Sequence, residues 1–209
     1  MDGVGPGQTK LFALEGLMKL RQICNASALI DHQAEQETEP AKIKELMRRL
    51  KEITGQHKVL VFSSFTGMLG LIRQQLETAQ TGYAYLDGKT KEDQRSKMVE
   101  RFQTQDDTRV FLISLKAGGT GLNLTAAEYV FLVDPWWNPA AESQAIDRCY
   151  RIGQKNKVMA YRMICKDTLE EKILNMQHQK RELADELVSA GKSRLQSLSP
   201  KDIFELFSR

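Results

Sequence analysis

The stretch Arg109-Val-Phe-Leu-Ile-Ser-Leu-Lys-Ala-Gly-Gly-Thr-Gly-Leu-Asn123 decides the fold class of this chain. It opens with a continuous apolar run, which is typical of a strand buried on both faces of a parallel sheet. Three glycines within four positions follow, beside Lys116 and Thr120, and they let the backbone come close to a ligand. Because the ligands of such sheets gather at the carboxyl ends of the strands, this turn is either a binding loop or simply a tight bend.

Similar apolar runs lie on both sides of this stretch, and helical patterns separate them. Strands that alternate with helices predict an α/β fold, with a parallel sheet that carries helices on both faces. Two capping boxes, Thr90 with Asp93 and Thr168 with Glu171, are expected to open two of the helices. The expected strands are 58–62, 83–86, 109–114, 129–134 and 158–165. The expected helices are 10–30, a helix opened by Pro40, 68–79, 90–103, 140–151 and 168–187.

The length of 209 residues suffices for one α/β domain with helical appendages rather than for two full cores. Its 41% hydrophobic and 27% charged residues are ordinary for a globular protein. We expect a lead-in at 1–9, an N-terminal helical segment at 10–56, the α/β lobe at 57–166, and a C-terminal helix and tail at 167–209.

Charge and cysteine content limit the classes of partner. A net charge of +3 is compatible with a nucleic-acid partner, but a dedicated DNA-binding domain is usually more basic and more clustered. No apolar run reaches the ~18 residues that a membrane span needs. The three cysteines, Cys24, Cys149 and Cys165, show no metal or disulfide spacing. We therefore expect an intracellular protein, cytoplasmic or nuclear, with no metal site of its own and no membrane partner.

Two further loops follow expected strands. Ser63, Ser64 and Thr66 place small hydroxyls at a helix start, where backbone N–H groups bind anions, although plain capping also explains such residues. The loop after Asp134 holds both tryptophans of the chain, Trp136 and Trp137, between two prolines. These rings either pack in the core or contact nucleic acid.

Arg148 and Arg151 lie three residues apart in an expected helix, so both side chains would share one helix face. Each guanidinium is a planar, permanently charged fork that suits phosphate oxygens. The pair could therefore serve one phosphate group from outside its binding loop, as arginine fingers do. The alternative is a solvated face on which Asp147 and Arg151 form a weak surface ion pair.

The chain carries no complete phosphate-binding fingerprint of its own. Gly119 and Gly121 are followed by Leu124 where a dinucleotide fingerprint needs its third glycine. Gly-Lys-Thr occurs at 88–90 and Gly-Lys-Ser at 191–193, but neither has the glycine five positions earlier that a P-loop requires. These features argue against a complete, small Rossmann-type enzyme.

Taken together, these motifs resemble the C-terminal RecA-like lobe of the Swi/Snf family of helicase-like ATPases, a P-loop-NTPase-like fold with helical extensions. The similarity runs from about Leu17 to Gln177. It rests on Lys19-Leu-Arg-Gln-Ile-Cys24 as the lead-in helix, Val59 to Phe65 as motif IV, Ser114 to Asn123 as motif V, and Gln144 to Gln154 as motif VI. The loop Asp134-Pro-Trp-Trp-Asn-Pro139 is similar to the form in bacterial members, which predicts a bacterial source.

The resemblance implies a division of labour between two lobes. ATP and Mg²⁺ would be held mainly by an N-terminal RecA-like lobe of the same protein. Arg148 and Arg151 would act on the ATP phosphates as arginine fingers, the catalytic residues of this lobe. The remaining residues toward the nucleotide would be Gly119, Gly121, Asn123, Gln144 and Asp147. The residues toward double-stranded DNA would be Ser63, Ser64, Thr66, Lys116, Thr120, Trp136 and Trp137.

The resulting prediction is the second lobe of an ATP-dependent double-stranded DNA translocase, monomeric and inactive as an ATPase by itself. The C-terminal helix from Thr168 would brace the first lobe. The alternative is a non-catalytic module with a RecA-like fold that binds nucleic acid or protein. A third possibility keeps the family and replaces duplex DNA by RNA or single-stranded DNA.

Overall fold

The computed structural model describes residues 6–31, 39–118, 121–150, 154 and 156–189. At its centre is a five-stranded sheet with the order β2-β3-β1-β4-β5, in which all neighbouring strands pair in parallel. The strands are β1 (Lys58–Ser63), β2 (Tyr83–Leu86), β3 (Val110–Ser114), β4 (Ala127–Leu132) and β5 (Met159–Arg162). The predicted α/β class and parallel sheet are confirmed.

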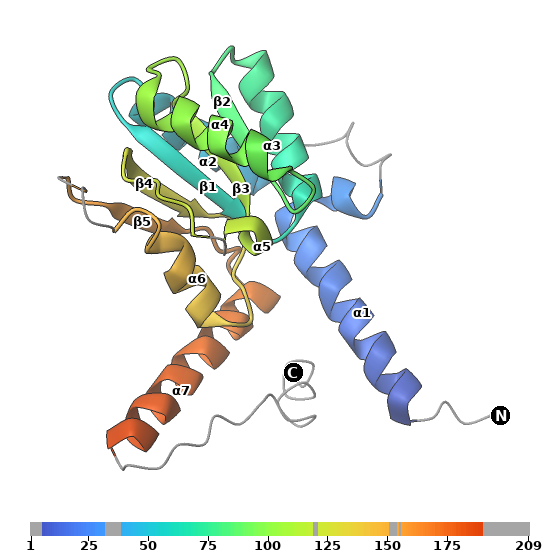
Figure 1. Cartoon of the computed structure of the whole chain (residues 1–209). Coiled ribbons are helices and arrows are strands. Elements are labelled where there is room, and N and C mark those ends of the chain that lie inside the picture. Colours follow the sequence, from blue (N-terminus) through green and yellow to red (C-terminus); the bar gives the residue numbers. More distant parts are fainter. Residues whose placement is uncertain (1–5, 32–38, 119–120, 151–153, 155, 190–209) are drawn as a thin grey trace.

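Helices cover both faces of the sheet, because alternate strand residues point to opposite sides (Figure 1). One face, the α2/α3 face, packs on α2 (Ala41–Ile53) and α3 (Thr66–Thr78). The other, the α4/α6 face, packs on α4 (Glu92–Thr104) and α6 (Pro139–Ile146). In β1, Val59 and Val61 belong to the first face, and Leu60 and Phe62 belong to the second. This two-sided burial explains why β1 and β3 read as continuous apolar runs.

Three other helical elements lie at the ends of the chain or in the loops: α1 (Pro6–Asn25), the 3₁₀ turn η1 (Ser27–Leu29), and the short α5 (Leu115–Gly118) directly after β3. The long α7 (Leu169–Ser189) closes the described chain. Figure 1 shows α1 and α7 projecting away from the sheet. None of the described helices is long and apolar enough to span a membrane.

The first predicted capping box is wrong. Helix α4 begins at Glu92 after Lys91, which makes no side-chain cap bond. The Thr90 hydroxyl instead bonds to Asp87, accepting from its backbone N–H at 3.1 Å. The Asp-Gly turn before the helix therefore uses the threonine that the sequence pattern assigns to the helix.

The second capping box forms in modified geometry. The Thr168 hydroxyl accepts from the backbone N–H of Glu170 at 3.2 Å, as a capping side chain does. Glu171 reaches back to the N–H of Asp167 at 2.8 Å rather than to that of Thr168. Asp167 has a left-handed backbone (φ 59°), which turns its N–H toward the helix.

The helix that carries the motif VI residues is shorter than expected. It ends at Ile146, and the chain continues through turns in which Arg148 N–H donates to Ala145 O (3.3 Å) and Cys149 N–H donates to Ile146 O (3.0 Å). Arg148 therefore lies beyond the helix end, whereas the expected helix 140–151 includes it. Arg151 lies outside the described residues.

Candidate functional site

Asp134 is the centre of a buried polar cluster at the carboxyl ends of β1 and β4. Its side chain is fully buried and accepts from the Ser63 hydroxyl at 2.5 Å and from the backbone N–H of Ser64 at 3.1 and 3.2 Å. The Ser64 hydroxyl also donates to it. Arg21, from α1, donates to the same carboxylate at 3.2 Å. One carboxylate thus ties together the ends of two adjacent strands and a helix.

Arg21 is 1% exposed, and Asp134 is only one of its partners. Its Nη2 donates to the Ser64 hydroxyl and to the carbonyl of Pro135, both at 2.9 Å. Its guanidinium also lies over three aromatic rings, at 5.0 Å from Phe65, 5.3 Å from Trp136 and 5.8 Å from Trp137. Burial lowers the pKa of Arg21, and the carboxylate of Asp134 opposes that shift. An arginine remains charged in such a site.

The tryptophan loop is held on its other side by Glu142, which is fully buried in α6. Glu142 Oε1 accepts from the backbone N–H of Trp136 at 2.7 Å, and Oε2 accepts from Arg162 of β5 at 2.7 Å. Gln177 of α7 donates to Glu142 at 3.0 Å and to the carbonyl of Trp136. The loop is therefore anchored from α1, α6 and α7, while both tryptophan side chains remain half-buried.

The residues expected to face DNA lie at different depths. Ser63 is fully buried and its hydroxyl is bonded to Asp134, so in this structure its side chain offers no surface to a ligand. Ser64 is half-buried. Thr66, the first residue of α3, and Lys116, in α5, are exposed. They follow β1 and β3, which are neighbours in the sheet, whereas Thr120 lies outside the described residues.

The segments expected to serve the nucleotide are brought together. Leu124 N–H donates to the carbonyl of Arg148 at 3.0 Å, and Gln154 Nε2 donates to the carbonyls of Thr125 and Ala127, each at 3.0 Å. The segment after motif V therefore lies against motif VI at the start of β4, the amino edge of the sheet.

The residues expected to contact the nucleotide differ in how exposed they are. Gly121, Asn123, Gln144 and Asp147 are exposed, and Gly121 has a left-handed backbone (φ 51°) with nothing within 4 Å of the position that a Cβ would take. Arg148 is only 5% exposed, so its guanidinium is enclosed by the protein. Gly119 lies outside the described residues.

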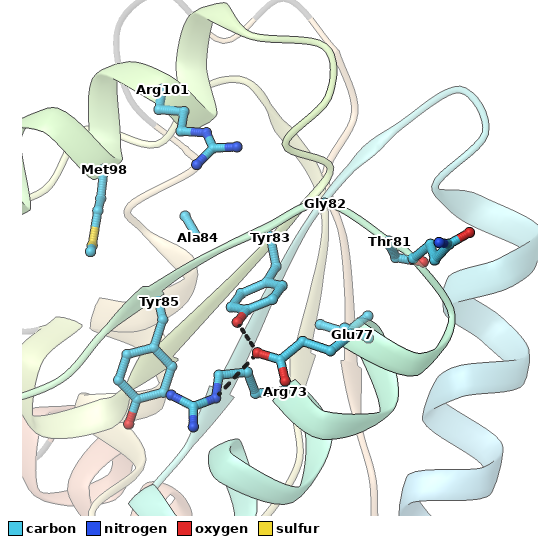
Figure 2. Close-up of a pocket in the computed structure, with 11 residues that line it drawn as sticks. Arg73, Glu77, Thr81, Gly82, Tyr83, Ala84, Tyr85, Met98 and Arg101 are labelled. Atoms are coloured by element: carbon cyan, nitrogen blue, oxygen red, sulfur yellow. Dashed lines mark hydrogen bonds and ion pairs between the residues drawn. The ribbon is translucent and has the colours of Figure 1, made fainter.

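A cavity of about 610 Å³ lies elsewhere, beside the edge strand β2. Figure 2 shows Tyr83 and Tyr85 of β2 pointing toward Arg73 and Glu77 of α3, and the Tyr83 hydroxyl donates to Glu77 at 2.5 Å. Burial raises the pKa of both tyrosines. The lining residues include none of the residues expected to bind ATP or DNA. This cavity is therefore separate from the candidate site at the ends of β1, β3 and β4.

The sequence pattern misses the residues that hold the site in place: Arg21, Asp134, Glu142 and Gln177. Asp134 carries a signal, since a charged residue there ends an apolar strand, whereas Arg21 lies in a helix that also holds Lys10, Glu15 and Lys19. Their partners are up to 114 positions apart in the chain, which periodicity does not detect.

Comparison with known proteins completes the assignment. A model of the helicase conserved C-terminal domain matches residues 41–153, which is more than half of the chain. The chain belongs to this helicase C-terminal family. Its fold matches the crystal structure of the C-terminal part of the Fun30 ATPase domain with a TM-score of 0.68 and 30% identity, over 90% of this chain and 60% of that one. The RecA-like lobe of Swi/Snf type that the motifs predict is thereby confirmed.

Curated relatives of this helicase lobe are much longer proteins. The chain is 43% identical over 170 residues to the DNA repair protein rad8 of Schizosaccharomyces pombe, and 42% identical over 161 residues to the chromatin-remodeling ATPase INO80 of Mus musculus. It is 38% identical over 208 residues to the putative ATP-dependent helicase/translocase YwqA of Bacillus subtilis. These matches cover 79%, 77% and 96% of the chain but only 15%, 10% and 22% of the relatives. Because eukaryotic and bacterial proteins match comparably, the bacterial source stays a prediction.

Proposed function

We propose that this chain is the second lobe of an ATP-dependent double-stranded DNA translocase and serves a nucleotide that an N-terminal RecA-like lobe of the same protein holds. The family supports an ATP-dependent enzyme of the helicase and remodeller type. The observation that carries the proposal is the contact between the two nucleotide-side segments, through Leu124 and Gln154, next to the first residue of β4.

The exposed residues of these segments fit a nucleotide. Gly121, Asn123, Gln144 and Asp147 are exposed, and nothing lies within 4 Å of the position that a Cβ on Gly121 would take. Among the described residues, no three acidic, histidine or cysteine side chains gather in a metal-binding group. We therefore assign the holding of Mg²⁺ to the other lobe, and ATP brought there would supply the phosphoryl group that is transferred.

Arg148 and Arg151 are the proposed arginine fingers. Fixed positive charge aimed at a transferring phosphoryl group stabilises the charge that develops there. Since Arg148 is enclosed in this structure, we propose that it reaches the phosphates only after the two lobes close. Closure would thereby make hydrolysis depend on the arrangement of the lobes, which is the coupling that a translocase needs.

On the DNA side, the proposed backbone contacts are Thr66, Lys116 and Thr120, with Ser64 beside them and Trp136 or Trp137 against the groove. Contacts of this kind position a protein without reading sequence. Ser63 would act indirectly, by holding Asp134 and the start of α3.

The exposed side of α1 supports a protein partner next to the lobe. Leu11, Phe12 and Ile23 are 65%, 63% and 54% exposed, and Leu14, Met18 and Leu20 are exposed as well. A large exposed apolar surface usually marks a contact site. We propose that the N-terminal lobe of the same protein covers it.

The test is DNA-stimulated ATP hydrolysis by the full-length protein. Arg148→Ala and Arg151→Ala should each lower turnover about 10³-fold or more, the usual cost of losing an arginine finger. Arg73→Ala, a half-exposed arginine beside the β2 cavity, is the matched control and should leave turnover unchanged. Residues 1–209 alone should show no ATPase activity. Stimulation by duplex DNA, single-stranded DNA and RNA, compared side by side, decides the substrate.

The burial of Arg148 favours one alternative, a non-catalytic RecA-like module in which this arginine only supports the fold. On that reading Arg148→Ala lowers the thermal stability while Arg151→Ala leaves ATP turnover intact. The same two variants therefore separate the two functions.

A further inference from the structure

Arg21 joins three parts of the molecule that are far apart in the chain. It belongs to α1, it bonds to Ser64 just before α3, and it bonds to Asp134 and Pro135 after β4. All three acceptors surround the same nitrogen, Nη2, whose two hydrogens are shared among them. Both tryptophan rings of the chain lie against that guanidinium, within 6 Å of its central carbon.

Stability alone does not explain a cation in this place. A buried ion pair is often no better for stability than well-packed apolar side chains of similar volume, because both charges lose their water. The planar fork offers something that an apolar side chain cannot, since it directs hydrogen bonds and stacks on rings at the same time. The surroundings use both properties: Ser64, Asp134 and Pro135 bond to Nη2, and the guanidinium lies over the rings of Phe65, Trp136 and Trp137.

We propose that Arg21 is a positioning residue that fixes the tryptophan loop and the start of α3 in the orientation from which they contact DNA. It acts through Asp134, Ser64 and the two tryptophan rings, and it touches no ligand itself, because it is 1% exposed. The inference rests on the proposed DNA-binding function of these loops. It also ties α1 to them, so a partner that moves α1 would move the DNA-facing loops.

The tryptophans provide a direct readout, since the chain has no others. In the 209-residue chain, Arg21→Met and Arg21→Lys should shift the tryptophan emission to the red and raise its quenching by acrylamide. Lysine restores the charge next to Asp134 but not the planar fork. A purely electrostatic role would be rescued by Arg21→Lys, and a positioning role would not.

Lys58→Met is the matched control. Lys58 is also a buried cation, 8% exposed, and it bonds to the carbonyls of Phe102 and Gln105 at the opposite end of β1 from Ser63. This variant loses a buried charge as Arg21→Met does, and should lower the melting temperature. Its tryptophan emission and quenching should remain those of the wild type.

Binding to a fluorescein-labelled DNA duplex supplies the second readout. Arg21→Lys should weaken binding about tenfold, the loss expected for one aromatic contact to nucleic acid. The slope of log K against log salt should stay unchanged, whereas loss of a direct phosphate contact would reduce that slope by about 0.9. Lys116→Met, at an exposed proposed phosphate contact, should show that reduction.

The outcomes separate the inference from the function on which it rests. If the wild-type chain binds no duplex, the proposed function fails, while the fluorescence still decides whether Arg21 holds the loop. If Arg21→Lys keeps wild-type emission and quenching, the positioning role is overturned whatever the DNA result. If Arg21→Met does not fold, Arg21→Lys decides alone.

Discussion

Removing both partners of the buried ion pair between Lys42 and Glu170 should destabilise the protein by less than the sum of the two single removals. Lys42 Nζ lies 2.5 Å from Glu170 Oε1, and the two side chains are 4% and 1% exposed. Lys42 also donates to Asn25 Oδ1 (3.2 Å) and to the carbonyl of Val133 (2.7 Å). Glu170 Oε2 accepts from the backbone N–H of Cys165 at 2.9 Å. The pair therefore attaches the first turn of α7 to α2 and to the end of the sheet.

The magnitude follows from these contacts. Lys42→Met leaves the Glu170 carboxylate buried without its cation, and breaking a buried pair in this way costs about 3–5 kcal/mol in the free energy of unfolding. Glu170→Gln leaves the ammonium in the same position and should cost a similar amount, although the amide oxygen can still accept from Cys165. In the double variant neither charge remains. Its cost should fall short of the sum of the two single costs by about 2 kcal/mol, within the range measured for residues in contact.

Urea unfolding followed by circular dichroism measures these free energies. The exposed pair Arg48–Glu52 gives the control cycle, with Arg48→Met and Glu52→Gln. Its N–O distance of 2.6 Å is nearly the same, but its side chains are 53% and 61% exposed. Its coupling energy should be at most about 0.5 kcal/mol, because solvent screens such pairs. A buried cycle with a coupling energy as small as the exposed one would refute the reasoning.

Two other predictions concern backbone packing and pH. A Cβ on Gly82 would lie 1.8 Å from the carbonyl oxygen of Asp107, so Gly82→Ala should lower stability by about 1–3 kcal/mol. Gly70 lies in α3, and nothing lies within 4 Å of the position of its Cβ, so Gly70→Ala should raise stability by about 0.5–1 kcal/mol. Thermal melts of the two variants measure both changes. Burial raises the pKa of Cys149 to about 12, so this thiol should react slowly with a thiol reagent at neutral pH in the folded protein and rapidly in urea. The unfolded thiol loses its proton near pH 8.5, so between that pH and about pH 12 the folded state binds more protons than the unfolded state. The free energy of unfolding therefore falls as pH rises through this window. Cys149→Ala should remove the part of that fall that is due to this thiol. An equally steep pH slope in the variant would contradict the assignment.

The architecture is readable from the sequence because burial on two faces leaves a local signal. The runs around Val59 and Val110 are continuous apolar segments, and their strands begin and end within one residue of expectation. The exposed edge strand β5 carries a weaker signal. The expected strand 158–165 shrinks to Met159–Arg162, which is mostly exposed, whereas the other edge strand, Tyr83–Leu86, alternates with buried residues and has the expected bounds.

The candidate site is readable only in part, because its support depends on distant pairs. The exposed positions of Thr66 and Lys116 follow from where strands end, which the apolar runs already give. The burial of Ser63 does not, because it depends on Asp134, 71 positions later in the chain. The end of α6 before Arg148 is equally hidden, since the tertiary contact of Arg148 with Leu124 competes with continued helix and no local residue type marks it.

Arg21 and Lys42, the buried cations of α1 and α2, both bond to the segment 133–135 that follows β4. Lys42 donates to the carbonyl of Val133, and Arg21 donates to Asp134 and to the carbonyl of Pro135. Asn25 connects the two cations, since its amide donates to the carbonyl of Arg21 and its oxygen accepts from Lys42. Val133, Asp134 and Pro135, which connect β4 to the two tryptophans, are thus bonded to side chains of α1 and α2. A loop that must present side chains to a ligand needs such support, because a displacement of about 1 Å is enough to spoil a binding geometry. The buried polar residues Arg21, Asn25 and Lys42 are therefore best explained by the loop that they hold, and the Arg21 variants test that explanation directly.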